Sequence, residues 1–105
     1  MASQSTTYAY AFGDASVTTV QAITSVGFAF TDAQLKKADY AFISIDGTTA
    51  RFTTDGTVPT ASVGHYVPNG ASFEVRGQQN IEKLQFVATT GTAYVAITLE
   101  SFNPN

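Results

Sequence analysis

The chain of 105 residues has only 12% charged residues, about half the usual share, and a formal net charge of −3. It has five Lys and Arg residues with no basic run longer than a pair, so we expect no nucleic-acid partner. The absence of cysteine excludes disulfides and thiolate metal sites, and no apolar run approaches the roughly 20 residues that span a bilayer. We therefore expect one globular domain with no membrane segment and no export signal.

The first thirty residues alternate between apolar and small or polar residues, as β-strands do. The alternation at 8–12 predicts a strand that ends at Gly13. The β-branched segment 17–23 predicts a second strand, and the alternation at 26–30 predicts a third.

One helical signal follows. Thr31 and Gln34 have the spacing of a capping box, with Thr31 as N-cap and Gln34 at the third helical position. Good helix formers continue to Ala38. We expect one or two turns of helix that pack on the sheet through Leu35, because so short a helix is not stable alone.

Strands resume from residue 40. Asp46-Gly47 is typical of a hairpin turn, Asp55-Gly56 of a second turn, and Pro68-Asn69-Gly70 of a third. The segments between them predict strands at 40–45, 48–54, 63–67, 72–76, 81–88 and 92–102, with a loop at 77–80.

About eight short strands with one brief helix predict an all-β fold, a single-domain β-sandwich or jelly roll. We expect the sandwich to cover 8–102, between an N-terminal arm at 1–7 and a C-terminal tail at 103–105. Few charges protect the edge strands of such a domain, and unprotected edges favour association with other subunits.

The sequence offers no catalytic constellation. His65 is the only histidine, whereas metal sites and nucleophilic triads need further partners around it. A tight turn after His65 would place Glu74 across a hairpin from it, as a hydrogen-bonding pair. Asp39, Glu74, Glu82 and Glu100 have no local structural role, but their spacing does not indicate a paired-carboxylate site. We expect no enzyme, cofactor or metal.

Without a catalytic site, the function expected of this protein is binding through its surface. Exposed tyrosines near the arms can stack on a neighbouring protein or on a sugar, and the 55–60 loop and the only histidine are further contact candidates. The candidate interface residues are Tyr8, Tyr10, Asp55, Gly56, Pro59, His65 and Phe102.

Several segments between Phe30 and Leu99 point to one group of proteins. They are Ala33-Gln34-Leu35, 38–43 (ADYAFI), 50–60 (ARFTTDGTVPT), Val63-Gly64-His65 before a glycine turn, Phe73-Glu74-Val75 and the 81–86 segment. Over the stretch from Phe30 to Leu99, about two-thirds of the chain, the protein resembles small virion proteins of tailed bacteriophages, which are similar to capsid decoration or cement proteins.

The resemblance implies a structural virion protein on the capsid exterior, made in the host cytoplasm. Its partners would be the major capsid protein and further copies of itself, as a dimer or trimer. The alternative is a non-catalytic binding module, for carbohydrate or a host surface, on a phage fibre or tail. In that case exposed tyrosines should line one groove.

Overall fold

The structure is a computed structural model that describes residues 6–102; the predicted tail and all of the predicted arm but Thr6 and Thr7 lie outside the described residues. Thr7 already belongs to the first strand. The elements are β1 (Thr7–Val17), β2 (Gln21–Ala22), α1 (Asp32–Lys37), β3 (Tyr40–Asp46), β4 (Ala50–Thr53), β5 (His65–Val67), β6 (Ser72–Arg76), α2 (Gln78–Glu82), β7 (Gln85–Ala88) and β8 (Ala93–Phe102).

The strands form two antiparallel four-stranded sheets, which confirms the predicted all-β sandwich. Sheet A has the order β1-β8-β3-β6 and sheet B the order β2-β7-β4-β5. Within these orders β1 pairs with β8, β2 with β7, β3 with β6 and β4 with β5. This nested pairing of early with late strands is the jelly-roll connectivity.

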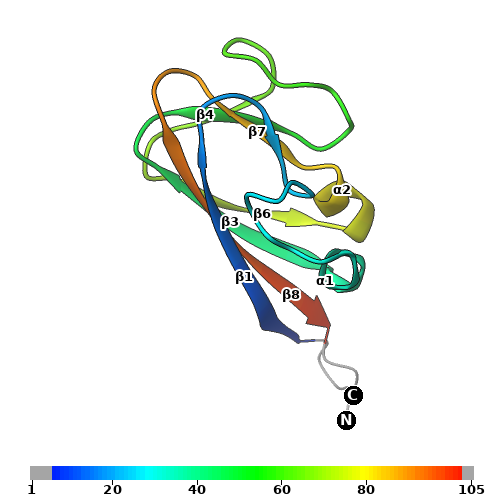
Figure 1. The fold of residues 1–105 in the computed structure, drawn as a ribbon. Coiled ribbons are helices and arrows are strands. Elements are labelled where there is room, and N and C mark those ends of the chain that lie inside the picture. The colour runs from blue at the N-terminus through cyan, green and yellow to red at the C-terminus, as the bar shows by residue number, and fades with distance from the viewer. Residues whose placement is uncertain (1–5, 103–105) are drawn as a thin grey trace.

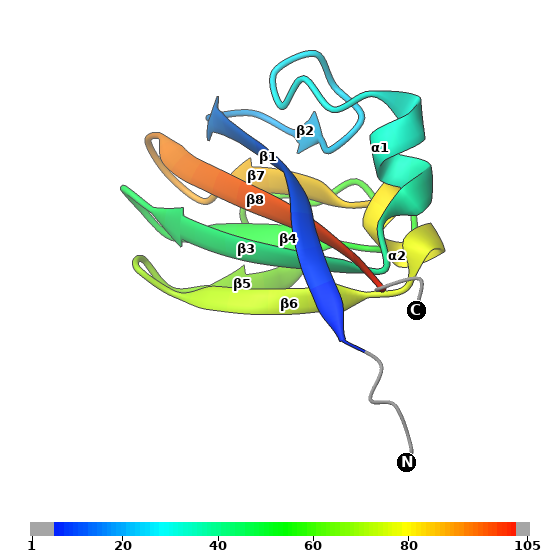
Figure 2. The ribbon, with the colours of Figure 1, turned by 90° about the horizontal axis from the view of Figure 1, so that it is seen from below.

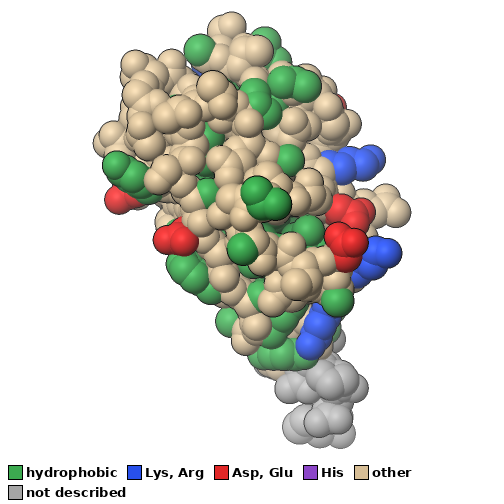
Figure 3. Space-filling view, viewed as in Figure 1, with side chains coloured by type: hydrophobic (Ala, Val, Ile, Leu, Met, Phe, Trp, Pro, Cys, Tyr) green, Lys and Arg blue, Asp and Glu red, His purple; other side chains and the backbone are tan. Residues whose placement is uncertain are grey.

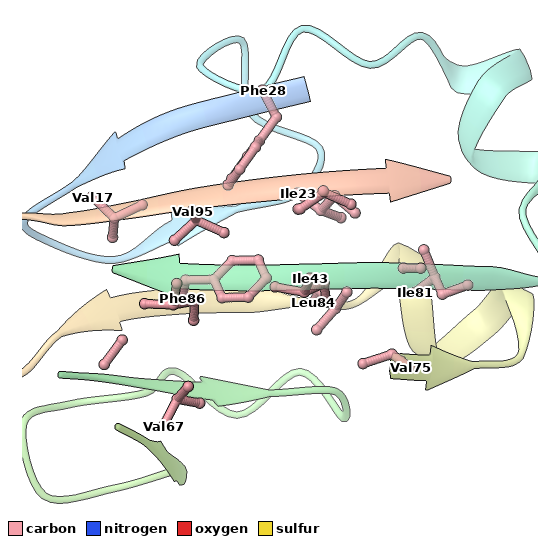
Figure 4. Packing of buried hydrophobic residues seen from close by; sticks show 14 of the residues in the cluster. Val17, Ile23, Phe28, Ile43, Val67, Val75, Ile81, Leu84, Phe86 and Val95 are labelled. Carbon is pink, nitrogen blue, oxygen red and sulfur yellow. The ribbon is translucent and has the colours of Figure 1, made fainter. Parts of the chain in front are cut away.

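The core lies between the two sheets (Figure 4). Ile43, Val95 and Ile97 face inward from sheet A, while Phe86 and Val67 face them from sheet B. Their side chains are almost completely buried. Both helices lie at one end of the sandwich, and the turns between β3 and β4 and between β7 and β8 lie at the other (Figures 1 and 2).

Helix α1 confirms the capping prediction. The Thr31 side chain accepts a hydrogen bond from the Gln34 amide at 3.1 Å, and the Gln34 side chain accepts one from the Thr31 amide at 2.9 Å. Leu35 is buried in the core, as its position predicted. The reciprocal bonds satisfy two amides that have no partner within the helix, so a helix this short can begin sharply.

The first thirty residues differ from the prediction. Gly13 does not end the first strand, because β1 continues to Val17. A Cβ on Gly13 would lie 2.5 Å from the Phe28 carbonyl oxygen, so this glycine permits a loop to approach the strand closely. In the segment 17–23, Val17 ends β1 and only Gln21–Ala22 forms a separate strand. The segment 26–30 is a loop that inserts Phe28 into the core, with the Phe28 and Phe86 ring centroids 5.8 Å apart.

The hairpin predicted at Asp46-Gly47 is wrong. Gly47 has φ +90, as a tight reversal requires, but β3 belongs to sheet A and β4 to sheet B. Both edges of β3 are already paired, one with β8 and the other with β6. The reversal therefore carries the chain across the sandwich instead of into a neighbouring strand.

A second helix was missed. The prediction of a loop at 77–80 is wrong, because α2 occupies Gln78–Glu82, and the strand predicted at 81–88 is present only in its second half, as β7 from Gln85 to Ala88. The helix has no side-chain cap, since its N-cap is Gly77 with φ +94. Ile81 and Leu84 are three residues apart and both fully buried, a helical spacing that the strand reading overlooked. Within the part described, no helix has the length and hydropathy needed to cross a membrane.

Asp39 has a structural role that the sequence did not indicate. Its carboxylate accepts hydrogen bonds from the Phe102 amide at 2.9 Å and the Ser101 hydroxyl at 3.2 Å. Its own amide donates to the Glu100 carbonyl, and its carbonyl accepts from the Gly77 amide. Asp39 thus joins the end of β8 to the start of β3 and to the approach to α2.

Replacing the turn glycines by alanine separates two costs. Gly47 and Gly56 have nearly equal φ angles, +90 and +92, which strain an alanine by about 1 kcal/mol or more. A Cβ on Gly56 meets nothing within 4 Å, but one on Gly47 would lie 2.8 Å from the Thr92 carbonyl oxygen. We expect Gly47→Ala to lower the free energy of unfolding more than Gly56→Ala, measured by denaturant titration. Equal losses would contradict the close contact at Gly47.

Candidate interaction face

The outer face of sheet A is rich in exposed aromatic side chains. Because side chains alternate along a strand, burial of the residues between them directs Phe12, Phe42, Tyr94 and Phe102 outward. They are 65%, 43%, 54% and 45% exposed. Tyr40 adds a fifth ring, which meets Phe102 edge-on with centroids 5.5 Å apart. We call this surface the aromatic face.

The register places these rings in rows across the strands. Phe12 on β1 lies opposite Thr98 on β8, which lies opposite Phe42 on β3. Tyr94 lies opposite Ser16 and Asp46 in a parallel row. The aromatic side chains therefore share one surface of sheet A, where Thr98, Ser16 and Asp46 lie opposite them on the neighbouring strands.

Carboxylates lie among the rings of the aromatic face. Asp14, Asp46, Glu74 and Glu100 also point outward from sheet A, and Arg76 is the one cation beside them. Four carboxylates and one guanidinium give this face a net charge of −3. Arg76 lies 4.0 Å from Glu74, with both side chains exposed, so this ion pair is weak.

An open hollow of about 780 Å³ lies at the Tyr94 end of this face. Its outward-pointing lining includes Asp14, Ser16, Ser44, Asp46, Tyr94 and Ala96. The carboxylates of Asp14 and Asp46 make no hydrogen bond or ion pair within residues 6–102. Both carboxylates are therefore available to an external partner.

The space-filling view shows how charge is distributed (Figure 3). Lys and Arg side chains lie on the right, the side of the two helices, with Asp and Glu side chains among them, and further Asp and Glu side chains lie on the left. The cations of α1 are Lys36 and Lys37, at its C-terminal end. Asp32 and Glu82 belong to the same two helices, so the helical side carries charges of both signs.

Tyr8 and Tyr10, two predicted interface residues, lie beside α1 and do not face outward with the aromatic face. The Tyr10 hydroxyl donates to the Gln34 carbonyl at 2.5 Å, and the Lys37 ammonium lies 4.7 Å from the Tyr10 ring centroid. Burial, then the Asp39 carboxylate, then the neighbouring Tyr8 raise the pKa of Tyr10 to about 12. Tyr10 thus holds α1 against β1, and Tyr8 is 38% exposed beside it.

Four predicted interface residues lie in or next to the loop 54–64, far from the aromatic face. Arg51 fixes this loop, because its guanidinium donates to the Ala61 carbonyl at 3.0 Å and the Gly64 carbonyl at 2.8 Å. The Asp55 carboxylate accepts from the Thr57 amide, which lowers the pKa of Asp55. Pro59 is buried, whereas Gly56 is exposed.

His65 is exposed on β5 and does not pair with Glu74. The hairpin predicted between them is wrong, because β5 is in sheet B and β6 in sheet A. The ring centroids of His65 and Phe52 lie 5.1 Å apart, and the Phe52 ring stacks on that of Phe73 with centroids 4.5 Å apart. His65 therefore ends a stack of three rings at the open margin of the core.

Of the seven predicted interface residues, only Phe102 belongs to the aromatic face. The residues that sequence reasoning missed are Phe12, Phe42 and Tyr94. Part of the signal is in the sequence, because Val95, Ile97 and Leu99 alternate along 92–102 with a second set of positions that includes Tyr94. Residues 6–102 contain no group of three or more His, Asp and Glu side chains that would hold a metal ion.

Tyr10 should be the last tyrosine to ionise. With a pKa of about 12 in the folded state against 10.0 for the free group, unfolded chains release this proton first. The contribution of Tyr10 to the free energy of unfolding should therefore be fully present below pH 10 and fall as the pH rises from about 10 to 12. Absorbance titration of the five tyrosines should show a late phase that Tyr10→Phe removes. Simultaneous titration of all five would contradict the buried hydroxyl.

Arg51→Met should loosen the loop 54–64. The variant loses both hydrogen bonds to carbonyls, at a cost of about 1 kcal/mol for a partly exposed cation. We expect a lower melting temperature and faster amide exchange at residues 60–64. Arg76→Met is the matched control, because its ion pair is exposed, and it should change neither. Unchanged exchange in Arg51→Met would show that the loop holds its shape without the guanidinium.

No family model matches this chain, and neither a curated protein nor a solved structure is similar to it at a significant level. The resemblance to phage virion proteins stays a prediction from the sequence segments given above. The jelly-roll fold and the aromatic face are the structural facts from which function is inferred.

Proposed function

We propose that this chain is a structural subunit of a bacteriophage virion, a decoration or cement protein that binds the capsid exterior as a small oligomer. The observation that carries the proposal is the aromatic face, a surface of sheet A with exposed aromatic side chains that no other part of residues 6–102 covers. Exposed hydrophobic side chains gathered on one surface mark protein interaction sites.

The energetics favour a structural contact. Removing apolar surface from water contributes about 25 cal/mol per Å², and aromatic anchors dominate the binding energy of most interfaces. Several subunits that bind together multiply a modest contact, so an oligomer holds a shell where a monomer would dissociate.

The fold agrees with this role without proving it. Jelly rolls are frequent among viral capsid and lectin domains, and fold alone does not define function. The proposal needs the face itself to bind, which substitutions on the face can test.

A carbohydrate-binding module is the second candidate. A hollow of about 380 Å³ favours it, because its lining includes Thr53, Thr54, Asp55, Thr57 and His65, whose hydroxyl, carboxylate and imidazole groups suit a sugar. The tyrosines do not support it, because they do not line one groove: Tyr8 and Tyr10 lie beside α1, and Tyr66 lies on sheet B. A glycan array with the purified protein would decide for this candidate if it gave saturable binding lost in His65→Ala.

Phe12→Thr and Phe42→Thr should each weaken binding to undecorated shells by about tenfold or more, because each removes an exposed aromatic anchor and keeps a strand-forming residue. Cosedimentation with shells gives the affinity, and circular dichroism checks the fold. Val58→Thr is the matched control, at a valine that is 59% exposed in the loop 54–64. Loss of binding only in Val58→Thr would move the contact to that loop and refute the role of the aromatic face.

A further inference from the structure

The aromatic face carries negative charge that no part of the described chain neutralises. Its four carboxylates stand against the single guanidinium of Arg76, which is already shared with Glu74 and lies 5.3 Å from the Tyr40 ring centroid. Glu100 accepts a hydrogen bond from Thr7 at 2.6 Å. Asp14 and Asp46 remain the two carboxylates of the face with no hydrogen bond or ion pair among residues 6–102.

A second copy of this chain is a poor occupant for this face. In a twofold contact the same patch meets itself, so each copy would bring four carboxylates and one guanidinium into the interface. Like charges brought together in a desolvated interface are strongly unfavourable. A twofold dimer of the chain must therefore use a different surface.

The geometry of the hollow indicates the chemistry of the occupant. Asp14 lies opposite Ala96 and Asp46 opposite Tyr94, so the two carboxylates flank β8 from the strands on either side. Strands two positions apart in a sheet are separated by about 10 Å, and the offset of Asp14 and Asp46 along β8 sets their carboxylates further apart than that. The half-exposed Tyr94 lines the same hollow, next to Asp46, and its ring leans toward Gly47. A guanidinium or ammonium group in this hollow would have the Tyr94 ring and the Asp46 carboxylate on one side and the Asp14 carboxylate across β8.

We propose that the aromatic face docks on a protein surface in which apolar side chains are bordered by Arg or Lys, and that one such cation enters the hollow between Asp14 and Asp46 against Tyr94. The inference rests on the proposed function, in which that surface belongs to the capsid exterior. The aromatic rings supply the apolar contact, and the carboxylates select a positively charged partner over a second copy.

The test compares charge variants in binding to undecorated shells. Asp14→Lys and Asp46→Lys should each weaken binding on the order of tenfold, and added NaCl should weaken the wild type more than either variant. Glu82→Lys, an exposed carboxylate on α2 away from the face, is the matched control and should bind like the wild type. Face variants that bind as the control does, or a wild-type dimer that these variants disrupt, would overturn the inference.

A second measurement does not depend on shells. N-acetyl-arginine methylamide, titrated into the isotopically labelled protein, should shift the NMR signals of Asp14, Tyr94 and Asp46 at millimolar concentration, and N-acetyl-glutamine methylamide should not. Shifts at these residues without any shell binding would refute the proposed capsid role but keep the cation site. Shell binding by the wild type without these shifts would refute the cation site and leave the capsid role standing.

Discussion

Strand β8 lies between β1 and β3 and pairs with both along most of its length. This double pairing determines which residues form the core side and which the outer side of sheet A. With both neighbours in place, Val95, Ile97 and Leu99 face the core. The same register directs Tyr94 and Phe102 to the outside. A slip by one residue would exchange the two sets, so burial of the aliphatic side chains fixes the aromatic face as firmly as it fixes the core.

Signals that act within a few residues were read correctly from the sequence. The capping box of α1, the burial of Leu35 and the inward alternation of β8 are all present. Signals whose meaning depends on distant partners were misread. Gly13 resembles the end of a strand, but its reason is a loop that crosses β1 closely. Asp46-Gly47 resembles a hairpin, but the paired edges of β3 leave no place for β4.

The candidate site was harder to predict than the fold. Phe42 lies within the apolar run of β3, and only its register against Thr98 and Glu74 shows that it faces solvent. Tyr10 stands out in the sequence as a contact residue, yet its hydroxyl is bonded within the domain. Composition also conceals the distribution of charge, because the modest net charge of −3 is carried mainly by one face while the lysines lie elsewhere.

The partnership of the first strand with the last also constrains how the chain reaches this structure. Thr7 lies opposite Phe102, and Val17 opposite Ala93, so the strands that define sheet A are almost the whole domain apart in sequence. Closing such long loops before any contact is gained is slow. Accordingly, β-sandwiches have lower folding rates than proteins whose contacts are local. During synthesis β1 and β3 emerge from the ribosome without the strand that joins them. The domain can therefore complete its fold only after β8 has emerged. Until then the apolar strands are exposed and can pair with other chains unless chaperones bind them.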